Sequence, residues 1–196
     1  MLPPSETSSS IWAHADAVSE YSPEERSLLL QIARESILSL LEGREMSLFT
    51  HSDHLSEPRG VFTTLHLKGH LRGCVGYPNP LLPLYRAVVE TARAAAFDDP
   101  RFVPLKIEEA AGLKVSLSAL SPVQPISPEE IEVGRHGLVI SQGRLRGLLL
   151  PQVAVEHGWD ARTLLEQTCR KAGLNANAWR DGARLEAFTA EVFADT

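Results

Sequence analysis

Hydrophobic positions along the 196-residue chain change their spacing several times, and each spacing predicts a different element. Helical spacing follows Ser22 and Pro23, a typical N-cap and first helical residue, and continues to Gly43. A second helix is expected over residues 84–97, where alanines accompany the apolar positions. The apolar stripe of the first helix consists of Leu28, Leu29, Ile32, Ala33, Ile37, Leu40 and Leu41.

Runs of β-prone residues predict strands around these helices. Two such runs flank Lys68-Gly69, where a tight two-residue hairpin turn is expected, and two more flank Gln142-Gly143. With each glycine as the second turn residue, His66 should face Leu71 and Leu65 should face Arg72. In the second hairpin Val139 should face Arg146. Residues 112–120 alternate between apolar and polar positions, which predicts another strand. Residues 184–193 alternate in the same way and predict the final strand, after an interrupted helix over residues 154–173.

The string Leu-Arg-Gly occurs twice, at residues 71–73 and 145–147. Each time it lies in the second strand of a predicted hairpin, and a helix and then a strand follow. We therefore predict a duplicated hairpin–helix–strand unit, first over about residues 60–121 and again over about 134–193. The fold class that follows is α+β, in which helices pack on one mixed β-sheet or on two similar sheets.

Composition restricts the class of protein more than its fold. The net charge is −6 and no apolar run approaches the about 20 residues of a membrane helix, so a cytoplasmic location is expected and nucleic acid is an unlikely partner. Two cysteines are too few for a disulfide scaffold or a zinc ribbon. Residues 1–20 begin rich in Pro and Ser, which predicts a flexible tail before a domain of residues 21–196.

The most suggestive candidate for chemistry is Cys74. A thiolate is the reactive form of cysteine, and a cation such as Arg72 stabilises it. A nucleophile also needs a base, which His66 or His70 could supply. The structural alternative is a small thiol packed in a strand.

The glycines beside Cys74 allow two interpretations. Gly73 and Gly76 would let a ligand approach the backbone closely, or they would serve packing alone. Since Leu-Arg-Gly recurs around Arg146 without a cysteine, we interpret that string as architecture. Only Cys74-Val75-Gly76 is then peculiar to the first copy.

Other candidate residues are less specific. His51, His54, His66 and His70 cluster in the sequence near Asp53, but their spacing matches no metal motif, so neither a metal site nor a cofactor is predicted.

The segment around Gln152, His157 and Trp159 remains open between packing and site lining. Trp159 suits either a core position or a stacking platform, and the imidazole of His157 could titrate near neutral pH.

Several rare strings occur in an order that resembles the AMMECR-domain family, also called AmmeMemoRadiSam system protein A. The resemblance covers about residues 23–193 and implies a mixed-sheet α+β protein of two β-rich repeats, with LRGCVG as its hallmark. It also implies two partners, a Memo-like protein and a radical SAM protein. The strings are LRGCVGY, AAAFDDPRF, EVGRHGLVI, RGLLLPQVAVEHGWD and CRKAGL.

Two functions are carried forward. The first is a binding or adaptor subunit that docks partners through the LRGCVG surface; the second is an enzyme that uses Cys74, with Arg72 as the other catalytic candidate, to modify a small molecule, peptide or nucleic acid. No complete set of acid, base and nucleophile is visible, which favours the first. The binding candidates are Arg72, Gly73, Cys74, Gly76, Arg146, Gln152, His157 and Trp159.

Overall fold

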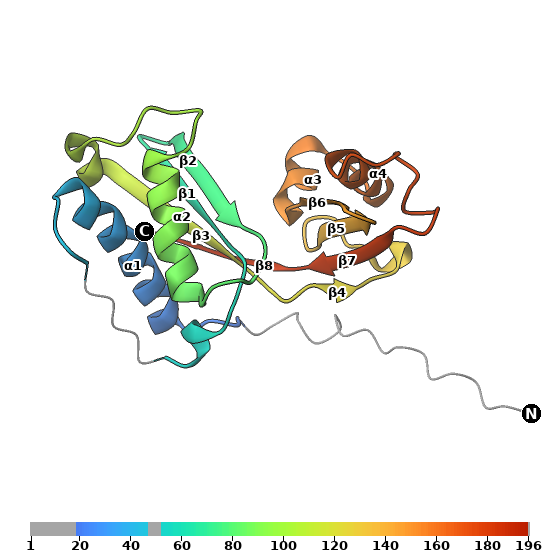
Figure 1. The fold of residues 1–196 in the computed structure, drawn as a ribbon, viewed down its shortest axis with the longest axis horizontal. Coiled ribbons are helices and arrows are strands. Elements are labelled where there is room, and N and C mark those ends of the chain that lie inside the picture. Colours follow the sequence, from blue (N-terminus) through green and yellow to red (C-terminus); the bar gives the residue numbers. More distant parts are fainter. Residues whose placement is uncertain (1–18, 47–51, 196) are drawn as a thin grey trace, which may run out of the picture.

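The computed structural model describes residues 19–46 and 52–195, so nearly all of the tail predicted over residues 1–20 lies outside the described residues. The first helix begins where its capping signals predict. Ser22 accepts a hydrogen bond from the backbone N–H of Glu25, whose side chain accepts one from the N–H of Ser22 in return. This capping box fixes the start of the helix, and the chain then folds into helices and two separate sheets (Figure 1).

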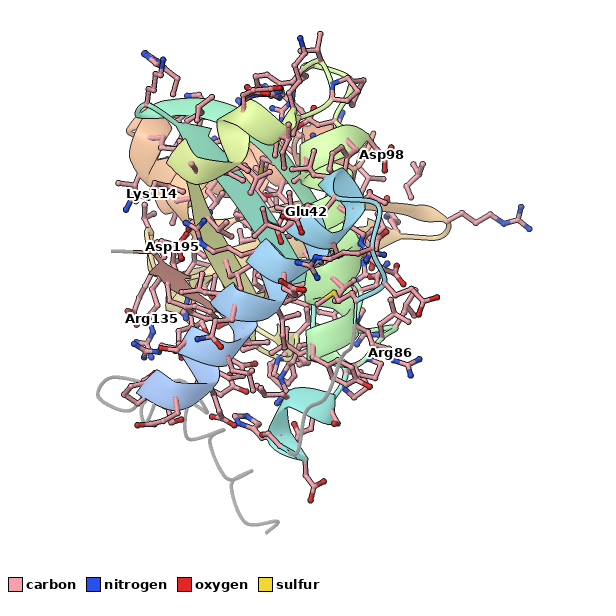
Figure 2. All side chains as sticks on the ribbon, turned by 90° about the vertical axis from the view of Figure 1, so that its left-hand side faces the viewer. Glu42, Arg86, Asp98, Lys114, Arg135 and Asp195 are labelled. Carbon is pink, nitrogen blue, oxygen red and sulfur yellow. The ribbon has the colours of Figure 1, made fainter. Side chains whose placement is uncertain are left out.

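The first sheet has the strand order β2-β1-β3-β8, and α1 and α2 lie side by side across one of its faces (Figures 1 and 2). Its core lies between that face and the two helices, where fully buried side chains such as Leu29, Leu65 and Val88 meet. The bounds are α1 (Pro23–Leu41), β1 (Val61–Leu67), β2 (His70–Tyr77), α2 (Leu84–Phe97), β3 (Leu113–Leu120) and β8 (Ala190–Ala194).

The second sheet has the order β4-β7-β5-β6 and is accompanied by two shorter helices. Its core joins the buried side chains of Leu138, Leu164 and Ala187. The bounds are β4 (Gln124–Pro125), β5 (Gly137–Gln142), β6 (Leu145–Leu149), α3 (Pro151–His157), α4 (Ala161–Lys171) and β7 (Arg184–Phe188). Three 3-10 helices, η1 (His54–Ser56), η2 (Ile107–Gly112) and η3 (Pro128–Glu130), lie in the connections.

Two chain segments run from one sheet to the other. β3 leads into β4, and β7 leads into β8 after the single residue Thr189. The segments lie against each other at the crossing, where the N–H of Ser121 donates to the carbonyl of Thr189 at 2.9 Å. The single final strand predicted over residues 184–193 is therefore wrong, because its two halves belong to different sheets.

The α+β class is confirmed, but the described sheets are antiparallel throughout rather than mixed. β2 and β3 run in the same direction, as expected on either side of α2, yet β1 lies between them and opposes both. In the second sheet β5 lies between β6 and β7 in the same way. This shared order agrees with the predicted duplication, which itself stays a prediction.

Within the described residues, no helix is both long and apolar enough to cross a membrane.

Candidate functional site

The hairpin that carries LRGCVG has the predicted turn, followed by an irregularity that the sequence did not indicate. Lys68 and Gly69 adopt φ values of 52° and 81°, as a tight two-residue turn requires, and His66 faces Leu71 as expected. The register then shifts, so that Leu65 pairs with Gly73. The predicted pairing of Leu65 with Arg72 is therefore wrong, because a β-bulge makes Arg72 an extra residue.

Arg72 forms an ion pair with Glu109 instead of contacting the thiol of Cys74. Its Nε and Nη2 donate to the two carboxylate oxygens of Glu109 at 2.9 and 3.0 Å, and only 11% of the Arg72 side chain is exposed. These hydrogen bonds lower the pKa of the Glu109 carboxyl from its ordinary value. The ion pair fastens η2 to β2, so its evident role is structural.

Gly73 and its counterpart Gly147 occupy equivalent positions against helix backbones. A Cβ atom at Gly73 would lie 2.0 Å from the carbonyl oxygen of Ala95 in α2. A Cβ atom at Gly147 would lie 2.4 Å from the backbone nitrogen of Ala172, at the end of α4. The glycine of each Leu-Arg-Gly string thus lets a helix pack directly on the strand, which supports the architectural interpretation.

Cys74 is half-buried on the edge strand β2, and two neighbouring side chains form hydrogen bonds with its backbone N–H and C=O groups. Its N–H donates to Asp99 Oδ2 at 2.9 Å, and its carbonyl accepts from Arg101 Nη2 at 3.2 Å. The guanidinium of Arg101 also donates to the buried Asp99 carboxylate, and this holds the pKa of Asp99 well below its usual range. The Cys74 thiol itself accepts a hydrogen bond from the hydroxyl of Thr64 at 3.3 Å.

A groove of about 630 Å³ lies between the two sheets, and two of the candidate residues, Gly76 and Arg146, line it. Its walls are mostly apolar. The charged groups among its described lining residues are Arg146 and Lys171, both cationic, and Arg146 Nη1 donates to Asn79 Oδ1 at 3.0 Å. The full lining is Phe62, Gly76, Pro78, Asn79, Arg146, Gly147, Leu148, Leu149, Leu150, Val153 and Lys171.

In the hairpin that carries Arg146, the pairing between the two strands is displaced by two residues from the predicted register. Gln142 pairs with Leu145, so the loop consists of Gly143 and Arg144 rather than Gln142-Gly143. Arg146 consequently pairs with Ser141 instead of the predicted Val139. Because the displacement is even, Arg146 still lies on the predicted face of the sheet, which it shares with Val139 and Ser141 of β5.

Some residues of the segment after β6, residues 150–159, line the groove, and others pack on the core of the second sheet. α3 ends at Gly158, whose φ of 64° is the left-handed conformation typical of a helix C-cap. The rings of His157 and Trp159 stack at a centroid distance of 4.6 Å, and Trp159 packs on the core of the second sheet. Neither these two residues nor Gln152 is among the groove lining, which takes Leu150 and Val153 from this segment.

The described residues contain no group of three or more His, Cys, Asp or Glu side chains placed to hold a metal ion. His51 lies outside the described residues. The imidazole of His54 stacks on the ring of Tyr21 with a centroid distance of 5.0 Å, and its Nδ1 lies 3.1 Å from Glu25 Oε1. These contacts give His54 a structural environment at the start of α1.

The groove residues that the sequence did not reveal include Phe62, Asn79 and Lys171. In the sequence, Phe62 cannot be distinguished from other apolar strand residues. In the structure its ring covers Gly76, where a Cβ atom would lie 2.1 Å from the ring. Lys171 lies in the last turn of α4, where a lysine is common on any exposed helix. Since no local pattern marks these residues, only the tertiary structure brings them together.

Comparison with known proteins identifies relatives along nearly the whole chain. The AMMECR1 family model matches residues 30–193. A protein of Methanothermobacter thermautotrophicus is 43% identical over 187 residues, which cover 89% of this chain and 97% of that protein. One of Methanocaldococcus jannaschii is 40% identical, with 88% and 90% covered. The crystal structure of an uncharacterised Pyrococcus horikoshii protein superposes with a TM-score of 0.80 at 40% identity, covering 90% of this chain and 94% of that one.

Proposed function

Because this chain belongs to the AMMECR1 family, we propose that it is a binding subunit that acts together with a Memo-like protein and a radical SAM protein. The two partners follow from the family resemblance, whereas the binding role is argued from the groove. That groove is the observation that carries the proposal, since it combines apolar walls with the two cations Arg146 and Lys171. Sites that bind ligands commonly combine a largely apolar concave surface with a few placed polar groups.

The environment of LRGCVG supports binding over catalysis. An activated cysteine needs a base or a cation within hydrogen-bond reach of the thiol. Here Arg72 is occupied by Glu109, and the described hydrogen bond to the Cys74 sulfur comes from the hydroxyl of Thr64. The Arg101 guanidinium does interact with Cys74, but it is already bound to the buried Asp99 carboxylate. The segment as a whole is used to build the edge of the first sheet, and within it Gly76 alone lines the groove. We therefore place the docking surface in the groove rather than on LRGCVG itself.

The test is direct binding of the purified Memo-like and radical SAM proteins to the intact protein. We expect at least one of them to bind, and we expect the double variant Arg146→Glu/Lys171→Glu to weaken that binding by about tenfold or more. The double variant Arg144→Glu/Arg170→Glu is the matched control. It makes the same charge changes at exposed neighbouring positions outside the groove lining. Failure of both partners to bind the wild-type protein would contradict the proposed function.

A Cys74-dependent enzyme remains the second candidate, favoured by the hydrogen bond from Thr64 to the half-buried sulfur. The Cys74→Ser variant separates the two functions. If the variant no longer modifies its small-molecule, peptide or nucleic-acid substrate but still binds the partners, the enzyme is supported. If modification is unchanged, the binding subunit is supported.

A further inference from the structure

We propose that the outer edge of β6 binds an extended acidic peptide as a fifth strand of the second sheet. The peptide carries apolar side chains and at least one carboxylate, and it belongs to a partner protein. This inference rests on the proposed binding function and names the kind of ligand that the groove receives.

The groove runs along the edge of β6 rather than over one of its faces. Five consecutive residues, 146–150, line it; four of them lie in β6, and Leu150 continues the chain in extended conformation at the N-cap of α3. Successive side chains of a strand point to opposite faces, so a cavity above one face would be lined by alternate residues only. A cavity lined by every residue in turn must follow the edge, and β6 is the last strand in the order of its sheet.

The backbone at this edge is available for pairing. Gln142 and Leu145 flank a two-residue loop and form its hydrogen-bonded pair, so Leu145 and every second residue after it bond to β5. The N–H and C=O groups of Arg146 and Leu148 therefore point outward, into the groove. Among the described residues, none of these four groups takes part in a backbone hydrogen bond with a turn or loop.

The corresponding edge of the first sheet is closed. At Cys74 the Asp99 carboxylate and the Arg101 guanidinium bind the outward N–H and C=O of β2, where a neighbouring strand would otherwise pair. Proteins commonly protect edge strands from unwanted pairing by such means. The edge of β6 lacks this protection within the described residues and lies in a groove of peptide size, as β-strand addition requires.

Charge and shape select the occupant. Arg146 and Lys171 are the charged groups among the described lining residues, although the chain carries a net charge of −6, so the groove favours a carboxylate. Five residues of extended chain span roughly 16 Å, a length that suits a peptide of about five residues and exceeds a small anion. A second copy of this chain would bring its own Arg146 against these cations, which disfavours edge-to-edge pairing of two copies.

The experiment begins with a displayed library of random heptapeptides selected against the intact protein. We expect the enriched peptides to alternate apolar residues with polar ones and to contain Asp or Glu. Synthetic fluorescein-labelled forms are then titrated by anisotropy against wild type, Lys171→Glu and Arg170→Glu. Both substituted residues lie in the last turn of α4, so their effects on the helix are matched. Lys171→Glu should weaken binding by about tenfold, and Arg170→Glu should leave it unchanged.

N-methylation of single peptide bonds tests strand addition itself. In an added strand only alternate amides bond to β6, so N-methylation should weaken binding by roughly tenfold at every second residue and little in between. Equal effects at all positions, enriched peptides without acidic residues, or full competition by acetate at equal affinity would overturn the proposal. A wild-type dimer in solution that Arg146→Glu dissociates would assign the edge to a second copy and would overturn it as well.

These outcomes are separable from those of the proposed function. If the selected peptides bind as described but neither partner protein binds, the peptide site stands and the proposed function fails. If a partner binds wild type and Lys171→Glu equally well, the binding role stands and the peptide site fails.

Discussion

Replacing Gly73 by alanine tests whether the Leu-Arg-Gly string is architecture or a ligand site. The added methyl group would lie 2.0 Å from the carbonyl oxygen and 2.9 Å from the carbonyl carbon of Ala95. Both atoms belong to the backbone of α2, so no side-chain rotation can relieve the contact. Either β2 or the helix must therefore move by about an ångström, although α2 is packed in the first core.

The free-energy cost of that movement can be estimated from known effects of overpacking. Overpacking a well-packed site typically costs about 1–3 kcal/mol, and a clash with two backbone atoms belongs at the upper end of that range. We expect Gly73→Ala to lower the free energy of unfolding by about 3 kcal/mol. For a chain of this size, that corresponds to a fall of about 6–12 °C in the melting temperature. Gly147→Ala, which meets the backbone of Ala172 at 2.4 Å, should behave alike.

Urea denaturation followed by circular dichroism measures the effect, with Gly112→Ala as the control. A Cβ at Gly112 meets only the Cδ1 atom of Leu67 at 3.3 Å, the end of a flexible side chain, so little change is expected there. The architectural interpretation is refuted if Gly73→Ala unfolds within about 0.5 kcal/mol of this control. Loss of partner binding at unchanged stability would instead identify Gly73 as a position that a ligand approaches.

Three further predictions concern the surroundings of β2. Arg101 depresses the pKa of Asp99, so this carboxylate stabilises the fold above its unfolded pKa and loses that contribution as the pH falls; Asp99→Asn should be less stable at pH 7 and show a shallower loss in acid unfolding curves. A double-mutant cycle of Arg72→Met and Glu109→Gln should give a coupling of about 1–3 kcal/mol, and additive effects would contradict the ion pair. Cys74 should react with a thiol reagent in the native protein, whereas the other, fully buried cysteine should react only after unfolding.

The parts of the fold that the sequence predicts well are those that local chemistry determines. Ser22 and Glu25, three residues apart, form a capping box, and Lys68-Gly69 forms its turn with Gly69, which accepts positive φ without strain, in the second position. The division of the final strand at Thr189 is different. Apolar alternation continues on both sides of that residue, and nothing in the alternation tells which sheet each half will join.

The site was harder to predict because its contacts are long-range. Arg72 is near Cys74 in sequence, but its partner Glu109 lies 37 residues away and reaches it only through the packing of η2. Lys171 and Gly76 meet at one groove although about half the chain separates them. Periodicity identifies which face of an element is buried, but it does not identify which exposed residues of different elements converge.

The contrast between the two hairpins gives LRGCVG a more definite meaning. Both use a glycine in the same position to seat a helix against the edge strand, so this feature cannot explain what is peculiar to either hairpin. What differs is the outer edge, which is closed by Asp99 and Arg101 on β2 and bordered by the groove on β6. Cys74 stands at the closed edge, where its backbone groups are already bonded. A ligand that needs free backbone groups is therefore directed to β6, and Gly76 and Phe62 of the first sheet form the opposite wall of the groove that receives it.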